Sequence, residues 1–175
     1  MQPAERDPQT RTALSAYQAG ALCWLGGGLI AVVLGALLGA VVASPDRSGN
    51  DPSPAGLVVV ALILGGTAAA AAGLGGLVRH WRWRRALAGT PWRRGLLRCA
   101  GPALMAFEPE GYDELGPGDE RVRLRLLSTA IWRTRAVQRM DGAEVRAAPV
   151  GRTEWVLTAD GVPTLYGARA VRRRR

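Results

Sequence analysis

The sequence predicts a membrane α-helical hairpin, made of two transmembrane helices, followed by a small, mainly β cytoplasmic domain. Three observations lead to this prediction: two long runs without charge, arginines concentrated after the second run, and short alternating segments in the C-terminal half. The 175 residues leave room for one modest domain beside the membrane helices. We expect that domain to be a barrel or a sandwich.

The two membrane helices are predicted at residues 21–43 and 56–78, which contain no charged side chain. A helix of that length is roughly 34 Å long and crosses a hydrocarbon core of about 30 Å. Residues 1–20 form an N-terminal tail. An alternative for the first run is a signal peptide cleaved after Ala43, but the apolar part of a signal peptide usually spans only about 7–15 residues.

The orientation follows from the arginines. Residues 44–55 are rich in Pro, Ser and Asp, which is typical of a loop, and contain only Arg47. From Arg79 onward the chain has twenty arginines against ten acidic residues, so the whole net charge of +9 lies there. Because arginine-rich flanks stay in the cytoplasm, we expect an external loop and both termini in the cytoplasm of a bacterial inner membrane.

Small residues recur at four-residue spacing in both runs, which places them on one helix face. Small side chains let helices approach closely in lipid. The simplest interpretation is that the two spans pack on each other, and the alternative is a homo-oligomer formed through the same stripes. The residues are Gly27, Ala31, Gly35 and Gly39 in the first run and Gly65, Ala69 and Gly73 in the second.

The segment at residues 79–91 combines arginine with tryptophan. We expect the second helix to run to about Ala88 and to end at Gly89-Thr90-Pro91. Arginine pairs with lipid phosphate and tryptophan is enriched at headgroup level, so this segment predicts contact with anionic lipid. Nucleic-acid binding is the less favoured alternative. The candidate lipid contacts are Arg79, Arg82, Arg84, Arg85, Arg93 and Arg94, and the interfacial anchors are Trp81, Trp83 and Trp92.

The β-rich domain is predicted at residues 92–171. Residues 121–126 alternate strictly between arginine and apolar side chains, as a half-buried strand does. We expect 131–137 to be the next strand, although a helix over 121–139 remains an alternative. Residues 96–99, 104–107 and 145–147 are further strands. The core is expected to comprise Leu126, Ile131, Trp132, Trp155, Leu157 and Leu165.

Turn residues support this interpretation. Asp160-Gly161 separates the apolar segments 155–158 and 162–166 and is typical of a β-hairpin turn. Asp141-Gly142 predicts a second turn before residue 145. The alternating arginines form either the solvated side of the sheet or a basic face that binds anions.

No complete catalytic, nucleotide or metal motif occurs, so the prediction is a non-enzymatic protein without cofactor or metal. Cys23 and Cys99 are expected to be free thiols, and Ser128 and Cys99 have no histidine in the β-rich domain to activate them. The acidic stretch at 108–120 does not have the order of a calcium loop and is expected to be solvated. The polybasic tail at 172–175 is expected to be disordered.

The segments HWRWRRALAGTPWRR and GAEVRAAPVGRTEWVLTADGVPTLYGARAV resemble uncharacterised two-span membrane proteins of actinobacteria. In these proteins a Trp/Arg-rich segment leads into a small cytoplasmic β-domain. The resemblance covers the chain loosely from about residue 80 onward. It implies a bacterial inner membrane protein and adds no site residues.

Three functions are compatible with these features. The first is an anchored interaction module that binds a protein partner or anionic lipid at the cytoplasmic face. The second is a membrane-tethered nucleic-acid-binding protein that uses residues 121–135 and the tail. The third, a transporter or channel accessory subunit, is disfavoured because the spans have no ionisable residue to line a path.

Overall fold

A computed structural model describes residues 2–42, 54–101, 103–111, 121–128 and 130–171. The chain divides into two units, each described by itself below. The helical unit is Ser15–His80, and the barrel unit is Met1–Leu14 together with Trp81–Arg175. The elements are η1 (Ala4–Arg6), α1 (Pro8–Val42), α2 (Pro54–Gly89), β1 (Arg93–Cys99), β2 (Leu104–Pro109), β3 (Val122–Leu126), α3 (Ile131–Gln138), β4 (Glu144–Pro149), β5 (Glu154–Ala159) and β6 (Tyr166–Ala170).

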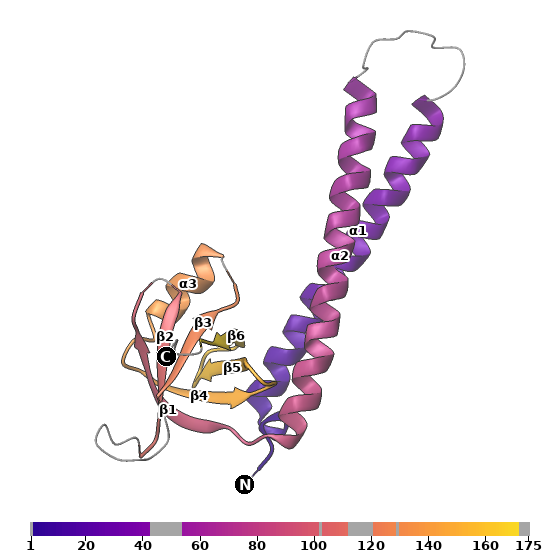
Figure 1. Cartoon of the computed structure of the whole chain (residues 1–175). Coiled ribbons are helices and arrows are strands. Elements are labelled where there is room, and N and C mark those ends of the chain that lie inside the picture. Colours follow the sequence, from indigo (N-terminus) through magenta and orange to yellow (C-terminus); the bar gives the residue numbers. More distant parts are fainter. Residues whose placement is uncertain (1, 43–53, 102, 112–120, 129, 172–175) are drawn as a thin grey trace. The chain divides into compact units, whose positions relative to one another are not determined.

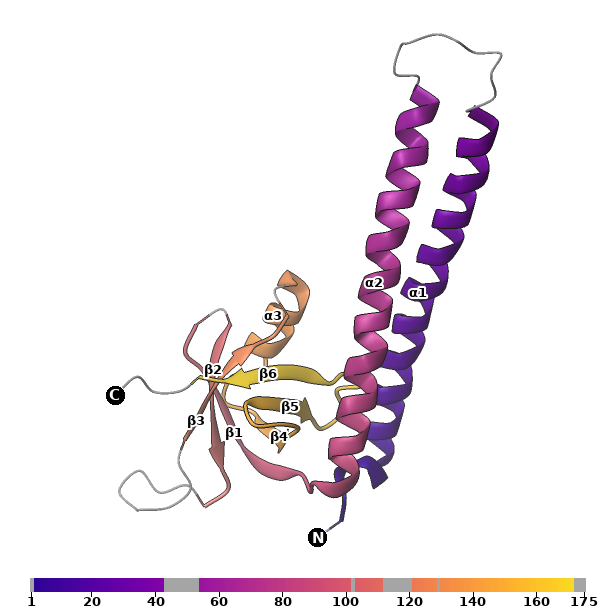
Figure 2. The same ribbon diagram turned by 45° about the vertical axis from the view of Figure 1, so that its right-hand side comes forward.

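In the helical unit, α1 and α2 run side by side in opposite directions (Figures 1 and 2). Glycines bring the two backbones together. A Cβ atom added at Gly28 would meet the backbone of Gly66 and Ala70, and one added at Gly73 would meet the backbone of Ala21 and Leu25. The two spans therefore pack on each other within one chain, as the simpler interpretation of the small residues predicted.

The residues in that contact differ in part from the predicted stripe. Gly35 faces Ile63 and Leu62, Gly39 faces Val59, and Ala31 lies against Gly66. A Cβ atom at Gly27 or Gly65, in contrast, would meet no other atom within 4 Å, so the prediction that these two glycines pack between the helices is wrong. The close contacts at Gly28, Gly35, Gly66 and Gly73 repeat every seventh residue, as in antiparallel helices that pack along a seam.

Both helices are long and apolar enough to cross a membrane. Only 11% of the most apolar window of each is buried within the structure. Large apolar side chains such as Ile30, Leu37 and Leu64 are more than half exposed, which is the opposite of a core helix in a soluble protein. Each helix also extends beyond its uncharged run: α1 begins at Pro8, and α2 continues to Gly89, where the sequence predicted its end.

The barrel unit is a closed barrel of six antiparallel strands in the order β1-β2-β3-β6-β5-β4. Of the two predicted architectures, barrel and sandwich, the chain adopts the barrel. Closure leaves no free strand edge, which removes the hazard of edge-to-edge association. Figures 1 and 2 show β1, β2 and β3 on one side of the barrel and β4, β5 and β6 on the other.

Alternation along the strands builds the core. In β3, Leu124 and Leu126 are buried and the alternating Arg123 and Arg125 are exposed, as the sequence predicted. Phe107 is completely buried and lies 6.3 Å from the ring centroid of Trp155. Gly142 and Gly161 have φ angles of 73° and 78°, which glycine adopts without steric cost, and they lie in the two predicted turns. The prediction of a strand at 162–166 is wrong, since β6 begins only at Tyr166.

The segment at 131–137 is a helix, α3, so the prediction of a strand there is wrong. As a consequence, Ile131 and Trp132, which were expected in the core, are 71% and 61% exposed. The side chains of this region that reach the core are Val137 of α3 and Met140 in the turn that follows it, and Ala136 packs against that core. The β-branched residues favoured a strand locally, and packing of the helix on the barrel overrides that preference.

Three predicted segments lie wholly or largely outside the described residues. They are the external loop at 44–55, of which only Pro54 and Ala55 are described, as the start of α2; the part of the acidic stretch from 112 to 120; and the tail at 172–175.

Candidate functional site

The C-terminal end of α2 belongs to the barrel unit and packs against the outer face of β6, opposite the side chains of Tyr166 and Ala168 that point into the core. Trp83 and Leu87, one helical turn apart, are 2% and 0% exposed. Gly167 of β6 provides the space for the indole, because a Cβ atom there would lie 2.8 Å from Cζ2 of Trp83. The opposite face of the same turns carries Trp81 and Arg85, both exposed. One face of this helix end therefore packs on the barrel, and the opposite face is exposed.

The N-terminal segment, which belongs to the barrel unit, also packs on the barrel. The backbone amide of Ala4 donates a hydrogen bond of 3.0 Å to the carbonyl of Thr90, and Pro3 forms an isolated bridge with Pro91. The side-chain amide of Gln9 donates to two carbonyl groups at the β5 turn, those of Ala159 (2.7 Å) and Val162 (2.8 Å). Residues at opposite ends of the sequence are therefore joined.

Arg146 of β4 is the centre of this contact. Its guanidinium donates to the carboxylate of Asp7 (3.0 Å) and to the side-chain oxygen of Gln9 (2.7 Å), and it pairs with Asp160 at 2.8 Å. It also lies 6.0 Å from the ring centroid of Trp92. The side chain of Arg146 is only 16% exposed, so these partners replace most of the water around its charge.

Asp7 is held in its ionised form. Burial opposes ionisation, but the hydrogen bond from the hydroxyl of Thr10 (2.9 Å), the charge of Arg146 and the amides of Thr10 and Gln9 together outweigh it and lower the pKa of Asp7. Asp7 precedes Pro8, the first residue of α1, where an acidic cap and a proline both favour the start of a helix. The carboxylate therefore both starts α1 and joins it to β4.

The predicted lipid contacts lie near the end of α2 and at the start of β1. Arg79, Arg82, Arg84, Arg85, Arg93 and Arg94 are all exposed, as lipid contact requires. Ion pairs with described carboxylates include Arg82 with Glu154 at 3.0 Å, Arg84 with Glu5 at 3.0 Å, and Arg94 with Glu144 at 3.9 Å.

The predicted interfacial tryptophans occupy three different environments. Trp81 is 60% exposed, with the guanidinium of Arg85 at 5.5 Å from its ring centroid, and it is well placed as an anchor. Trp83 is buried, so its predicted role at the lipid interface is wrong. Trp92 is half-buried, and its indole donates a hydrogen bond of 3.2 Å to the hydroxyl of Thr10. Hydrophobicity predicted that these side chains leave water, and two of the three enter protein instead of lipid.

A basic face covers the outer side of β3 and β6. Arg125 and Arg169 lie directly opposite each other in the antiparallel pair, and Arg123 is two residues from Arg125 on the same face. All three are exposed, and none of the carboxylates that the structure describes forms an ion pair with them. Like charges placed opposite each other repel. Glu154 of β5 lies opposite Arg169 on its other side, so this repulsion is greatest at Arg123 and Arg125. We call Arg123, Arg125 and Arg169 the basic face.

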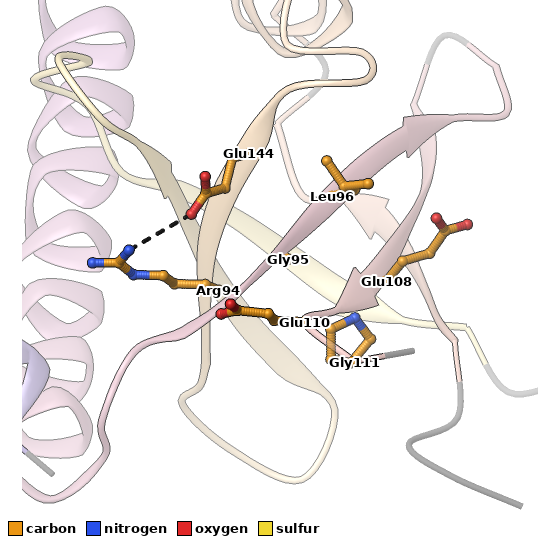
Figure 3. Close-up of a pocket in the computed structure, with 8 residues that line it drawn as sticks. Arg94, Gly95, Leu96, Glu108, Glu110, Gly111 and Glu144 are labelled. Carbon is orange, nitrogen blue, oxygen red and sulfur yellow. Dashed lines mark ion pairs between the residues drawn. The ribbon is translucent and has the colours of Figure 1, made fainter. Parts of the chain in front are cut away.

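An open pocket of about 370 Å³ lies where β1, β2 and β4 meet (Figure 3). Its charged lining residues are Arg94, Glu108, Glu110 and Glu144. Arg94 points toward Glu144, whereas Glu108 points away from that pair and contacts Arg98 (3.8 Å) and Arg121. Within the residues that the structure describes, no group of three His, Cys, Asp or Glu side chains is arranged to hold a metal ion.

The thiol and hydroxyl groups singled out from the sequence have ordinary structural contacts. Burial, with a smaller effect from Asp141, raises the pKa of Cys99, which disfavours the reactive thiolate. Asp141 also accepts a 2.7 Å hydrogen bond from the backbone amide of Cys99. Ser128 accepts a 3.3 Å hydrogen bond from the amide of Ala130. Cys23 and Cys99 are free thiols, as predicted.

Sequence reasoning missed the cluster of Asp7, Gln9, Thr10 and Arg146. One signal pointed to it: the other residues of the stretch VRAAPV around Arg146 are apolar, and an arginine in such a strand needs a partner. The partner's position, in the predicted N-terminal tail, had no sequence signal.

Comparisons with models of protein families, with curated proteins and with solved structures found no match to this chain.

Proposed function

We propose that this protein is a two-span integral membrane protein that presents its β-barrel at the cytoplasmic face as a non-enzymatic interaction module. The observation that carries the proposal is the exposure of the apolar helix surface, since only 11% of the most apolar window of either helix is buried. An apolar surface of this size is stable in lipid and costly in water. A charged residue within an apolar run would oppose insertion, and neither run contains one.

The contacts of the N-terminal segment support a hairpin with both ends on one side. Asp7 and Gln9 bind Arg146, Ala159 and Val162 in the barrel unit. A chain that places residues 2–14 and 81–171 on the same side of a bilayer has to cross it an even number of times. Cleavage of a signal peptide after Ala43 would remove Asp7 and Gln9, so these contacts favour retention of the first helix.

The charge distribution supports the cytoplasmic side and an anionic-lipid partner. Arg79 and Arg85 are exposed, and Trp81 beside Arg85 is suited to the headgroup level. Each arginine close to an anionic leaflet contributes about 1 kcal/mol, weakened by salt. The two arginines together with Trp81 therefore bias the end of α2 toward an anionic surface. The same exposed face can also bind a protein partner or a second copy of the chain.

The test combines extraction with topology reporters. The full chain in bacterial membranes is expected to stay in the pellet after carbonate washing. Reporters fused before Met1 and after Arg175 are both expected to be active only on the cytoplasmic side. Release of the chain into the supernatant would contradict membrane insertion, and a periplasmic reporter at either end would contradict the proposed hairpin. Replacing Arg79 and Arg85 with glutamine is expected to weaken the preference for vesicles that contain phosphatidylglycerol.

One observation favours a second candidate, the membrane-tethered nucleic-acid-binding protein. The basic face has the repeated positive charge that contacts a phosphate backbone. The barrel packs on Trp83, Leu87 and Gln9, so residues 92–175 alone lack part of its packing and the full chain in nanodiscs is the appropriate material. A gel shift that weakens steeply with salt and is lost in Arg125→Gln/Arg169→Gln would favour this candidate, and no shift at low salt would remove it.

A further inference from the structure

The first turn of α3 exposes two large apolar side chains. Ile131 is 71% and Trp132 is 61% exposed, whereas Val137 near the end of the helix and Met140 in the turn after it are buried in the barrel core. A core helix turns its largest apolar residues inward, and α3 does the reverse at its N-terminal end. An exposed isoleucine next to an exposed tryptophan on a water-facing helix is a costly arrangement that indicates a contact.

The charges around this pair have one sign. The guanidinium of Arg133 lies 4.9 Å from the ring centroid of Trp132, and Arg135 and Arg139 are exposed on the same short segment. The sequence of α3, IWRTRAVQ, contains no acidic residue. Exposed tryptophan is enriched at the headgroup level of membranes, and the flanking arginines can pair with lipid phosphates.

We propose that α3 is a second lipid contact of this protein, in which Ile131 and Trp132 enter the headgroup region of an anionic bilayer and Arg133, Arg135 and Arg139 bind lipid phosphates. The inference rests on the proposed function, because it requires the chain to be held at a membrane by α1 and α2. It goes beyond that function because the barrel unit itself would bind anionic lipid through α3.

Lipid fits this surface better than a protein does. A stable protein interface buries roughly 1,200–2,000 Å², which two side chains do not supply. A contact tethered to its own bilayer needs far less intrinsic affinity, because the tether keeps the local lipid concentration high. The one-sided charge also matches a phosphate-rich surface and disfavours a second copy of α3, whose arginines would face those of the first.

The experiment measures Trp132 fluorescence in the full chain reconstituted in vesicles. Emission of Trp132 is taken as the difference between the native chain and Trp132→Phe, and it is recorded with ordinary and with brominated phospholipids. In vesicles rich in phosphatidylglycerol, the brominated lipid is expected to remove most of this emission. The substitution Arg135→Gln/Arg139→Gln is expected to restore it. Trp155→Phe is the matched control: the emission of Trp155, half-buried beside Phe107, is expected to be unaffected by bromine.

The outcomes separate this inference from the proposed function. Equal Trp132 emission in ordinary and brominated vesicles, with the chain still resistant to carbonate, would overturn the role of α3 and leave membrane insertion intact. Emission that responds to the ratio of protein to lipid but not to bromine would show a second copy of the chain at α3 and would also overturn it. Removal of the chain from vesicles by carbonate would contradict membrane insertion, and with it the proposed function. The unfolding midpoint of Trp132→Phe is expected to equal that of the native chain, since the side chain does not contribute to the core.

Discussion

Gly167 lies against the indole of Trp83, so close that a Cβ atom at position 167 would be 2.8 Å from Cζ2 and 3.2 Å from Cη2 of the ring. The pair joins β6 to the last turns of α2. The absence of a side chain at position 167 is what allows the largest side chain of this helix end to be buried in the barrel unit. Removing that space is therefore a direct test of how α2 is held.

Gly167→Ala is expected to lower the free energy of unfolding by roughly 1–3 kcal/mol, because the added methyl group overpacks a filled site. The measurement is denaturant unfolding of the full chain in detergent micelles. In a Trp83→Leu background the same substitution is expected to cost less, since the smaller side chain leaves room, and this coupling identifies the pair. Gly151→Ala is the control, because its nearest neighbour lies at 3.9 Å. Equal effects at the two glycines would contradict the contact.

The helix pair offers two adjacent glycines with opposite expected behaviour. Gly28→Ala is expected to destabilise the hairpin, because the added carbon would meet the backbone of Ala70 and Gly66. Gly27→Ala is expected to be neutral or to stabilise the helix by up to about 1 kcal/mol, since nothing lies within 4 Å and alanine is the better helix former. Unfolding of the full chain by titration of a denaturing detergent measures both. A larger loss of stability for Gly27→Ala than for Gly28→Ala would contradict the contact face of α1 that contains Gly28.

The N-terminal contact is tested by Gln9→Ala. This change removes two hydrogen bonds to the β5 turn and one from Arg146, and the expected loss of stability is roughly 1–3 kcal/mol. Gln18→Ala, an exposed glutamine farther along α1, is expected to have little effect. Thermal unfolding of both variants in the same micelles gives the comparison. A silent Gln9→Ala would remove the argument that the N-terminal segment and the barrel lie on one side of the membrane.

Asp7 is expected to make stability depend on pH in the acidic range. Because the pKa of Asp7 is lower in the folded protein than its ordinary value near 4, its stabilising effect is fully present above about pH 4. The effect is then lost as the pH falls through the folded-state pKa, when the carboxylate is protonated and no longer attracts Arg146.

The measurement is the unfolding midpoint as a function of pH between neutral and strongly acidic solution. Asp7→Asn is expected to be less stable than the native chain at neutral pH and to lose less on acidification. Glu110→Gln, at an exposed position, serves as the control for general acid effects. A native chain and an Asp7→Asn variant with the same pH profile would show that Asp7 does not contribute in this way.

Local patterns predicted most of the secondary structure. The uncharged runs, the alternation at residues 122–126 and the Asp-Gly pairs before Val145 and Val162 each depend on residues near one another in the chain. They identify helix, strand and turn because hydrophobic periodicity and glycine's conformational freedom are short-range properties. The prediction was wrong for the segment at 131–137, where arginines alternate with other side chains as in a strand, but the chain forms a helix whose Val137 is in the barrel core.

The sequence by itself therefore determined that the chain contains two bilayer-length apolar helices, an arginine-rich second half and a β-rich domain. Only the tertiary structure decided where each large apolar side chain goes: Trp83 is buried against the outer face of β6, and Trp132 is exposed. It showed that Gly28, and not Gly27, lies between the two helices. It also joined Asp7 to Arg146 across 139 positions of sequence. The physical reason is that hydrophobicity drives a side chain out of water without specifying protein or lipid, and that choice depends on long-range packing.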